Sequence, residues 1–313
     1  MSDATNLIHL GVDSERYGGI VNTPVYRAST VLFPNTGAMA ERYEALSRGE
    51  DGVMTYARKG TPASFALCDT LSRLEGGYRA RLFPSGAAAC AAGILAYVGA
   101  GDHVLITDSA YAPTRHLVQE VLPRYGISAD FYDPLLGQDI SKLFKANTRL
   151  VYCESPGSHS FELQDIPAIA AVAHSHGALV ACDNTWATGL YFKSFTKGVD
   201  ISIHSATKYI TGHSDVSMGV VIANETAWPA LYDYATHLGQ TSGGDDVYLA
   251  QRGLKTMATR MQAQARHSMQ IAEWLLSQKQ VSAVIHPAHP SHPQHPLWQR
   301  DFTGSAGLFA FAF

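Results

Sequence analysis

Between residues 79 and 223, short apolar runs alternate with segments that have the periodicity of an amphipathic helix. Helical patterns at 87–97, 113–122 and 167–176 lie between the earlier runs. The apolar runs predict strands at 79–83, 103–107, 127–132, 150–154, 178–183, 201–205 and 219–223. This alternation is typical of an α/β fold with a mostly parallel, seven-stranded sheet covered by helices on both faces. Ligands of such sheets bind at the carboxyl ends of the strands.

The first sixty residues have no sustained period and predict an irregular arm. Glycines and prolines interrupt the pattern at Gly18, Gly19, Pro24, Pro34 and Gly37. A helix is then predicted, because Thr61 can cap it, Pro62 suits its first position and Gly76 with Gly77 can end it. Tyr56 and Arg58 lie just before this helix, and taken alone they are expected to be surface residues.

At the other end of the sequence, Phe309, Phe311 and Phe313 alternate with small residues. The alternation predicts a strand that presents the three rings on one face and has no following partner. An apolar strand without a partner favours aggregation, so we expect a C-terminal part that is incomplete.

Composition restricts the class of protein. The chain has 313 residues, of which 46% are hydrophobic and 16% charged, with a formal net charge of −4, so we expect a folded protein that binds neither nucleic acid nor an anionic membrane. The longest apolar stretch, 86–100, is too short to cross a bilayer, and residues 1–6 do not resemble a secretory signal. The cysteines are widely spaced, which predicts reduced core residues in a cytoplasmic protein: Cys68, Cys90, Cys153 and Cys182.

Three of the predicted strand ends carry residues with a chemical role. After the first strand, Ser85, Gly86 and Ala87 form a small-residue turn that leads directly into a helix. Free backbone N–H groups and the helix dipole can bind a phosphate there. The turn is also compatible with an ordinary strand-to-helix connection in which glycine only permits the geometry.

A second strand end carries Asp183, and another carries Tyr111 a few residues later. A carboxylate after a buried strand is either a helix cap or the partner of a buried cation, such as a protonated pyridine nitrogen. Tyr111 can stack on an aromatic ring, although a single loop tyrosine is more often a core or surface residue.

The third strand end leads into Ser205-Ala206-Thr207-Lys208, which places two hydroxyl groups beside an amine. Pyridoxal phosphate needs an amine to bond its aldehyde and neutral donors for its phosphate, and Lys208 with Ser205 and Thr207 can supply them. A lysine after a strand is otherwise a solvated turn residue. The phosphate turn, Tyr111, Asp183 and Lys208 occur in the number and type that this one cofactor requires, so the sequence predicts pyridoxal 5′-phosphate.

A metal site is not expected. Four histidines occur every third residue in a proline-rich segment, at His286, His289, His292 and His295. The prolines prevent a helix that would bring the rings together, and no carboxylate or cysteine accompanies them. We therefore expect an exposed loop.

These motifs resemble those of the pyridoxal-phosphate enzymes of cysteine and methionine metabolism. The resemblance extends from about residue 20 to the last residue and rests on Ser205-Ala206-Thr207-Lys208-Tyr209, Asp183-Asn184-Thr185 and Tyr56-Ala57-Arg58. Trp186 and the segments 154–158 and 301–305 are similar to those of the family's β-lyases. The resemblance implies the aspartate-aminotransferase-like fold (fold type I), with an arm at 1–60, a cofactor domain at 61–250 and part of a small C-terminal domain at 251–313.

The resemblance also implies a role for each site residue. Lys208 would bond the cofactor and act as the base at the substrate's α carbon, and Tyr111 would stack on the cofactor ring. Asp183 would pair with the pyridine nitrogen, and Trp186 and Tyr56 would shape the substrate pocket. The phosphate would be held by Ser85, Gly86, Ala87, Ser205 and Thr207, together with Tyr56 and Arg58 of a neighbouring subunit in a dimer, which commonly pairs into a tetramer.

The activity that the resemblance implies is α,β-elimination of L-cystathionine to homocysteine, pyruvate and ammonia. Elimination or replacement at the γ carbon is the alternative within the family. The family's C-terminal domain supplies an arginine for the substrate's α-carboxylate. We expect this arginine to be missing here, and a cofactor-binding protein without catalytic activity is therefore a further alternative.

Overall fold

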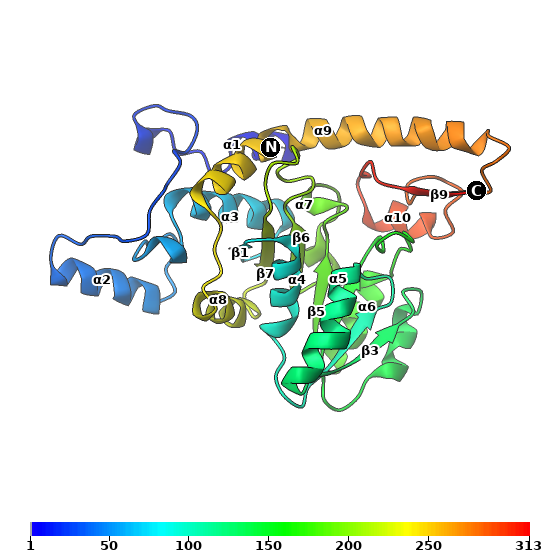
Figure 1. The fold of residues 1–313 in the computed structure, drawn as a ribbon, viewed down its shortest axis with the longest axis horizontal. Coiled ribbons are helices and arrows are strands. Elements are labelled where there is room, and N and C mark those ends of the chain that lie inside the picture. The colour runs from blue at the N-terminus through cyan, green and yellow to red at the C-terminus, as the bar shows by residue number, and fades with distance from the viewer. Residues whose placement is uncertain (1) are drawn as a thin grey trace.

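The computed structural model describes residues 2–313 and contains a central sheet of seven strands (Figure 1). The strand order is β1-β7-β6-β5-β4-β2-β3. The strands are β1 (Arg79–Phe83), β2 (His103–Thr107), β3 (Ser128–Tyr132), β4 (Thr148–Glu154), β5 (Leu179–Asp183), β6 (Ile201–Ser205) and β7 (Gly219–Ala223). All seven predicted strands are confirmed, with ends displaced by at most two residues.

The sheet is mostly parallel, as predicted. Strands β3, β2, β4, β5 and β6 pair in parallel, and β7 runs antiparallel to both β6 and β1. The carboxyl ends of β4, β5 and β6 therefore lie next to one another along one edge of the sheet.

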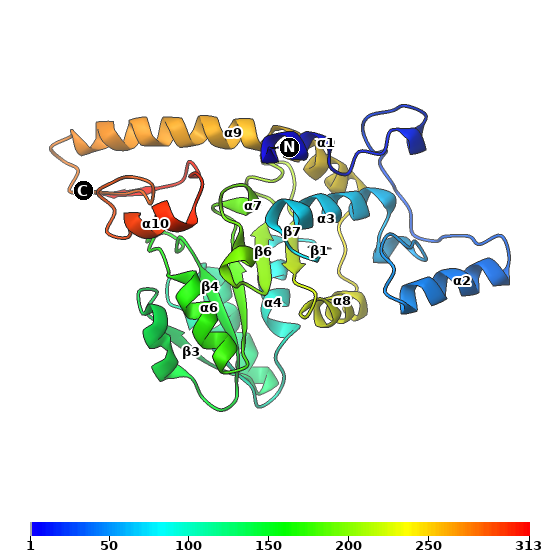
Figure 2. The same ribbon diagram turned by 180° about the vertical axis from the view of Figure 1, so that it is seen from behind.

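Helices cover both faces of the sheet. Helices α3 (Pro62–Glu75) and α6 (Ile166–Ser175) pack against one face in a core that includes Leu71, Ile169 and Val180. Helices α4 (Gly86–Leu95) and α8 (Trp228–His237) pack against the other. Figures 1 and 2 show the two faces from opposite sides. The long helix α9 (Gly244–Leu276) runs past the sheet toward the C-terminal segment, as both figures show.

The predicted helix at 113–122 is α-helical only at its start. Helix α5 (Ala112–His116) continues as a π-helical turn at Leu117–Val121 and a 3-10 turn at Leu122–Tyr125. Pro123 has no backbone N–H, which is a sufficient reason for the α-helical pattern to end before it.

The prediction of an irregular arm at 1–60 is wrong in part. The arm contains α1 (Asp3–His9), α2 (Thr36–Ser47) and short 3-10 helices at Glu15–Tyr17 and Ala57–Lys59. Asn35 caps α2, since its side-chain oxygen accepts a hydrogen bond from the N–H of Ala38 at 2.8 Å. The part of the arm that carries α2 extends away from the body of the molecule (Figure 1).

Two expectations for the C-terminal segment are also wrong. The last strand, β9 (Ala310–Ala312), does have a partner, because it pairs antiparallel with β8 (Ala283–Ile285). The histidine segment is not an exposed loop throughout, because His286 and His292 are buried. The His286 ring is hydrogen-bonded through Nε2 to the Oγ of Ser268 on α9 at 3.1 Å. Ser268 is thus the hydrogen-bond partner that a buried polar ring requires. Helix α10 (His295–Asp301) follows this segment.

The remaining short elements are α7 (Thr188–Tyr191) and 3-10 helices at Gly137–Leu143 and Ser194–Lys197. In residues 2–313, none of the helices combines the length and the apolar character that a membrane crossing requires. All four cysteines are free thiols, and Cys90, Cys153 and Cys182 are buried as expected.

Candidate active site

Three polar residues lie close together at the ends of β4, β5 and β6. Asp183 and Ser205 were predicted as site residues, and Glu154 is their neighbour on β4. Glu154 and Asp183 are direct neighbours across the paired strands, and β6 ends at Ser205. Asp183 Oδ1 accepts a hydrogen bond from the N–H of Thr185 at 2.9 Å. The hydroxyl of Thr185 in turn accepts one from the N–H of Ser205 at 2.8 Å. Hydrogen bonds therefore connect the Asp183 carboxylate to the start of the turn that carries Lys208.

Asp183 lies buried on the face of the sheet that α4 covers. Its Oδ2 is 3.6 Å from the thiol sulfur of Cys90 on α4. Burial raises the pKa of Asp183, while hydrogen bonds from Thr185 and the charge of His204 act in the opposite direction. A buried carboxylate without an ion-pair partner in residues 2–313 is suited to a cationic group of a ligand.

Tyr111 lies beside this pair of carboxyl groups. Its backbone N–H donates a hydrogen bond to Glu154 Oε2 at 2.7 Å, and its side chain is 42% exposed. Burial, followed by the charge of Asp183, raises the pKa of Glu154 well above its usual range. Sequence reasoning gave Glu154 no role of its own, because its contact with Asp183 depends on strand register.

The predicted phosphate turn forms the start of α4. Ser85 caps the helix by accepting a hydrogen bond from the N–H of Ala88 at 3.1 Å. A Cβ atom at Gly86 would lie 2.5 Å from Ser205 Oγ, so only glycine permits this approach of the helix start to the end of β6. Ala87 belongs to the first turn of the same helix. The structure thus brings Ser85, Gly86, Ala87 and Ser205 together.

Lys208 lies in the turn after β6 with an exposed side chain. Its N–H donates to the carbonyl of Ser205 at 3.0 Å, which fixes the turn. The hydroxyl of Thr207 is hydrogen-bonded to the backbone of Met218, donating to its carbonyl at 3.2 Å and accepting from its N–H at 3.0 Å. In this arrangement Thr207 holds the turn against the start of β7.

These residues fit pyridoxal phosphate on four structural grounds. The glycine at position 86 lets the start of α4 lie directly against Ser205, and the N–H groups of a helix start can bind a phosphate. Asp183 offers a buried carboxylate to a protonated ring nitrogen, and Tyr111 offers an exposed ring for stacking. Lys208 has no ion-pair partner within residues 2–313, which leaves its amine available.

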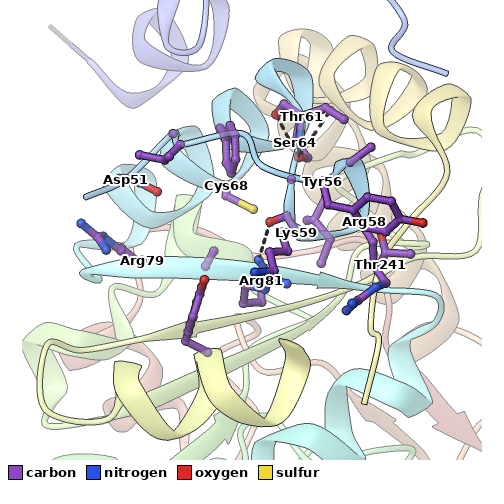
Figure 3. Close-up of a pocket in the computed structure, with 18 of the residues that line it drawn as sticks. Asp51, Tyr56, Arg58, Lys59, Thr61, Ser64, Cys68, Arg79, Arg81 and Thr241 are labelled. Atoms are coloured by element: carbon purple, nitrogen blue, oxygen red, sulfur yellow. Dashed lines mark hydrogen bonds between the residues drawn. The ribbon is translucent and has the colours of Figure 1, made fainter. Parts of the chain in front are cut away.

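Tyr56 and Arg58 lie apart from this group. They line a cavity of about 810 Å³ between the arm, β1 and α8 (Figure 3), together with Arg81 and other residues. None of Ser85, Asp183 and Lys208 lines that cavity. Arg58 Nη1 donates to the carbonyl of Thr236 at 2.8 Å, and Tyr56 is 39% exposed.

Trp186 is buried and its indole N–H donates to the carbonyl of Leu308 at 2.9 Å. Its ring meets Phe302 edge to face, with the ring centres 6.2 Å apart. In the described structure Trp186 therefore fastens the C-terminal segment to the end of β5. No group of three or more metal-binding side chains occurs in the part of the chain that the structure describes.

The model of a family described as "Cys/Met metabolism PLP-dependent enzyme" matches residues 4–313. The chain therefore belongs to this family of enzymes, which use pyridoxal phosphate.

Three curated relatives are similar over almost the whole chain. A putative cystathionine beta-lyase of Rhizobium johnstonii is 48% identical over 98% of the chain and 76% of the relative. Cystathionine beta-lyase MetC of Escherichia coli is 41% identical over 98% of the chain and 78% of the relative. An L-alanine/L-glutamate racemase of Wolbachia pipientis is 39% identical over 100% of the chain and 78% of the relative.

The crystal structure of metB from Corynebacterium glutamicum superimposes with a TM-score of 0.92 at 30% identity. The match covers 100% of this chain and 79% of that one. Together with the family match, it confirms the predicted fold type I architecture.

Proposed function

We propose that the protein is a carbon–sulfur lyase that converts L-cystathionine and water to homocysteine, pyruvate and ammonia. The observation that carries the proposal is the meeting of Asp183, Ser205 and the α4 start at one sheet edge, beside the turn with Lys208. The relatives named cystathionine beta-lyase, 38–48% identical in the bacterial examples from Rhizobium, Escherichia and Haemophilus, favour this substrate.

Each residue has a defined task in this proposal. Pyridoxal phosphate, when bound, withdraws electrons from the substrate's α carbon. Lys208 would hold the cofactor through its amine, and the same amine would act as the base that removes the substrate's α proton. The Asp183 carboxylate would pair with the ring nitrogen and keep it protonated. The bond between the β carbon and sulfur would then break, and the proton held by Lys208 would balance the departing thiolate, so that homocysteine leaves as its thiol.

Lys208→Ala tests the assignment of the base. We expect the variant to lose both the visible absorption of the lysine-bound cofactor and all pyruvate release, because no other amine replaces the one that bonds and deprotonates. Absorption spectra and a pyruvate assay with L-cystathionine measure both effects. Turnover that survived the substitution would show that another group is the base.

A second candidate is amino-acid racemisation, which the similarity to the Wolbachia racemase favours. It starts with the same removal of the α proton but returns the proton to the opposite face. Incubation with L-alanine followed by chiral analysis would detect the D-isomer. In a parallel incubation with L-cystathionine, release of 2-oxobutyrate would indicate cleavage at the γ carbon. Spectral binding without any product in either incubation would indicate a non-catalytic protein.

We further propose that Tyr56 and Arg58 serve the site of a second copy of this chain, in a dimer that can pair into a tetramer. Their cavity contains none of the cofactor residues of their own chain. The arm also exposes apolar side chains, including Ile20, Val21 and Leu32, which are 60%, 61% and 86% exposed. Such a surface is typical of a protein interface.

Mixing inactive subunits tests this arrangement. A heterodimer of Arg58→Ala and Lys208→Ala chains would contain one site with both defects and one intact site. An equimolar mixture is therefore expected to recover roughly a quarter of wild-type activity. A mixture of Lys208→Ala with Asp183→Ala is the control, since every site then keeps one defect. Equal recovery in both mixtures, or none in either, contradicts the arrangement.

We also propose a division into an arm at 1–60, a cofactor-binding domain at 61–250 and a contribution to a C-terminal domain at 251–313. A cytoplasmic location is part of the proposal, because all four cysteines are free thiols, which is typical of a reducing compartment.

A further inference from the structure

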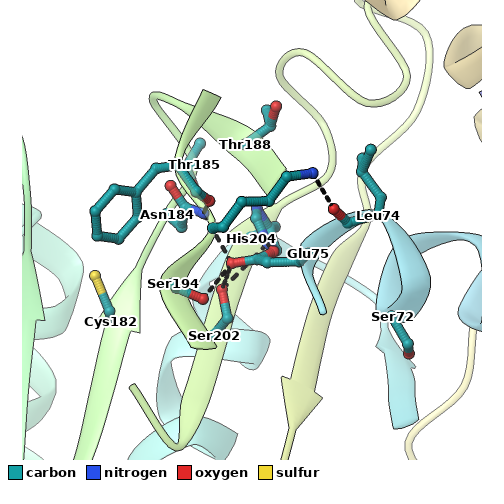
Figure 4. Close-up of polar contacts among 12 residues, drawn as sticks. Ser72, Leu74, Glu75, Cys182, Asn184, Thr185, Thr188, Ser194, Ser202 and His204 are labelled. Atoms are coloured by element: carbon teal, nitrogen blue, oxygen red, sulfur yellow. Dashed lines mark hydrogen bonds and ion pairs between the residues drawn. The ribbon is translucent and has the colours of Figure 1, made fainter. Parts of the chain in front are cut away.

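Glu75, the last residue of α3, is a buried carboxylate that the proposed reaction does not use. Four side chains donate hydrogen bonds to it, as Figure 4 shows. They are Asn184 at 2.8 Å, Ser194 at 2.5 Å, His204 at 2.6 Å and Ser202 at a similarly short distance. These donors come from the end of β5, the 3-10 turn that follows α7, and β6.

His204 and Glu75 form a buried ion pair. Burial lowers the pKa of His204, but the charge and the hydrogen bond of Glu75 outweigh it and raise the pKa overall. Burial likewise raises the pKa of Glu75, but the charge of His204 and the three hydroxyl and ring donors lower it overall. A buried ion pair gives little net stability compared with apolar packing, so its presence calls for another reason.

The pair lies on the reverse face of the strands that carry the cofactor residues. Asp183 pairs with Ile203 across β5 and β6, and both face α4. Side chains alternate along a strand, so His204 on β6 and Asn184, which directly follows β5, point to the opposite face. The N–H of Asn184 donates to the carbonyl of Ile203 at 2.8 Å, which holds the two strand ends together at this point.

We propose that His204, held by Glu75, is a positioning residue for Asp183 that fixes the strand end and places a positive charge behind the carboxylate. The inference rests on the proposed pairing of Asp183 with the cofactor's ring nitrogen. The other titratable groups whose pKa responds to the charge of Asp183 are acids: Glu154 and Tyr152 on β4, Cys182 on β5 and Cys90 on α4. His204 on β6 therefore offsets their effect and favours the ionised form that a ring nitrogen needs.

Glu75→Gln tests the role with an isosteric change. The amide keeps an oxygen for Asn184 and the serines but removes the charge that keeps His204 protonated. We expect the dissociation constant of pyridoxal phosphate from the apo-protein to rise about tenfold, equivalent to about one pKa unit at Asp183. Ser194→Ala is the matched control, because it removes one hydrogen bond from the same carboxylate and leaves its charge. Its dissociation constant should stay within about twofold of wild type.

A cofactor analogue separates the electrostatic role from a structural one. In 1-deazapyridoxal phosphate a carbon replaces the ring nitrogen, so Asp183 has no cation to pair with. Glu75→Gln should bind this analogue as well as the wild-type protein does. An equal loss of affinity for both cofactors, or no loss for either, would overturn the proposal. His204→Gln supplies the same comparison if Glu75→Gln does not fold.

The wild-type protein distinguishes failure of this inference from failure of the proposed site. If the wild type binds the two cofactors with equal affinity, the pairing of Asp183 with the ring nitrogen is wrong, and the inference falls with it. If the wild type prefers pyridoxal phosphate and Glu75→Gln retains the full preference, only the role of His204 is wrong.

Discussion

Two carboxyl groups, the partly buried Glu154 and the buried Asp183, lie side by side at neighbouring strand ends. Ionising both at once is unfavourable. Burial and the charge of Asp183 raise the pKa of Glu154 well above its usual range, while at Asp183 hydrogen bonds from Thr185 and the field of His204 oppose the effect of burial. We therefore expect Glu154 to carry the proton at neutral pH and to support Tyr111 as a neutral acid.

This assignment predicts different outcomes for two substitutions of Glu154. Glu154→Gln is neutral and keeps an oxygen that can accept from the N–H of Tyr111, so cofactor affinity should change less than about twofold. Glu154→Ala removes the acceptor and should weaken affinity about tenfold, which corresponds to one lost hydrogen bond. Fluorescence titration of the apo-proteins measures both. A large loss in Glu154→Gln would mean that Glu154 works as a carboxylate.

The burial of His286 predicts a protein that is sensitive to acid. Burial, and then the charge of His289, lower the pKa of His286 to about 4, while an unfolded histidine titrates near 6.5. Between these values the unfolded chain binds a proton that the folded chain does not. The free energy of unfolding should therefore fall as pH drops from about 6.5 to about 4, by up to about 3 kcal/mol.

Urea unfolding at several pH values measures this dependence. His286→Asn should flatten it, because the group that resists protonation is gone. The exposed His267→Asn is the control and should keep the wild-type slope. If His286→Asn also kept that slope, the acid sensitivity would arise elsewhere.

At the scale of single residues, the sequence indicates which polar side chains end each strand, and the structure brings these together. Their partners were not predictable, because they depend on register and on contacts between distant segments. Glu75 and His204 are 129 positions apart. The position of Trp186 is a similar case, since its partner Leu308 lies 122 residues away.

At the scale of elements, the start of α4 depends on its close approach to β6. Gly86→Ala should lower the free energy of unfolding by about 1–3 kcal/mol, because the new Cβ would lie 2.5 Å from Ser205 Oγ and 3.1 Å from its Cα. Gly99→Ala is the control, since its Cβ would be no closer than 3.9 Å to Asp102. Chemical denaturation compares the two. Equal effects would mean that the packing of Gly86 against Ser205 does not matter.

The elements of the sheet were predictable because each strand is a short apolar run between turn residues, as at 103–107. The arm was not, because α2 has few buried residues and its only strong signal is the cap at Asn35. The pairing of β9 with β8 was missed because β8 has only three residues, 283–285, in a segment rich in prolines.

At the scale of the whole molecule, the exposed apolar side chains of the arm predict assembly. Leu32→Asp should weaken the proposed dimer and lower the mass measured by light scattering, since a charge at an apolar interface is costly to bury. Leu135→Asp makes the same change at another exposed leucine, away from the arm, and should leave the mass unchanged. Dissociation by both variants, or by neither, would argue against the arm as the interface.

Trp186 lies three residues past Asp183, so the Cα atoms of the two residues are at most about 11 Å apart and the indole lies near the proposed cofactor partner. Tryptophan emission overlaps the absorption of bound pyridoxal phosphate, which makes this indole a natural donor for resonance energy transfer. Quenching of its fluorescence would then report occupancy of the site without any added label. The indole of Trp186 also donates a hydrogen bond to Leu308. Detachment of the C-terminal segment would therefore expose the indole and shift its emission to the red, so the fluorescence would report this detachment as well.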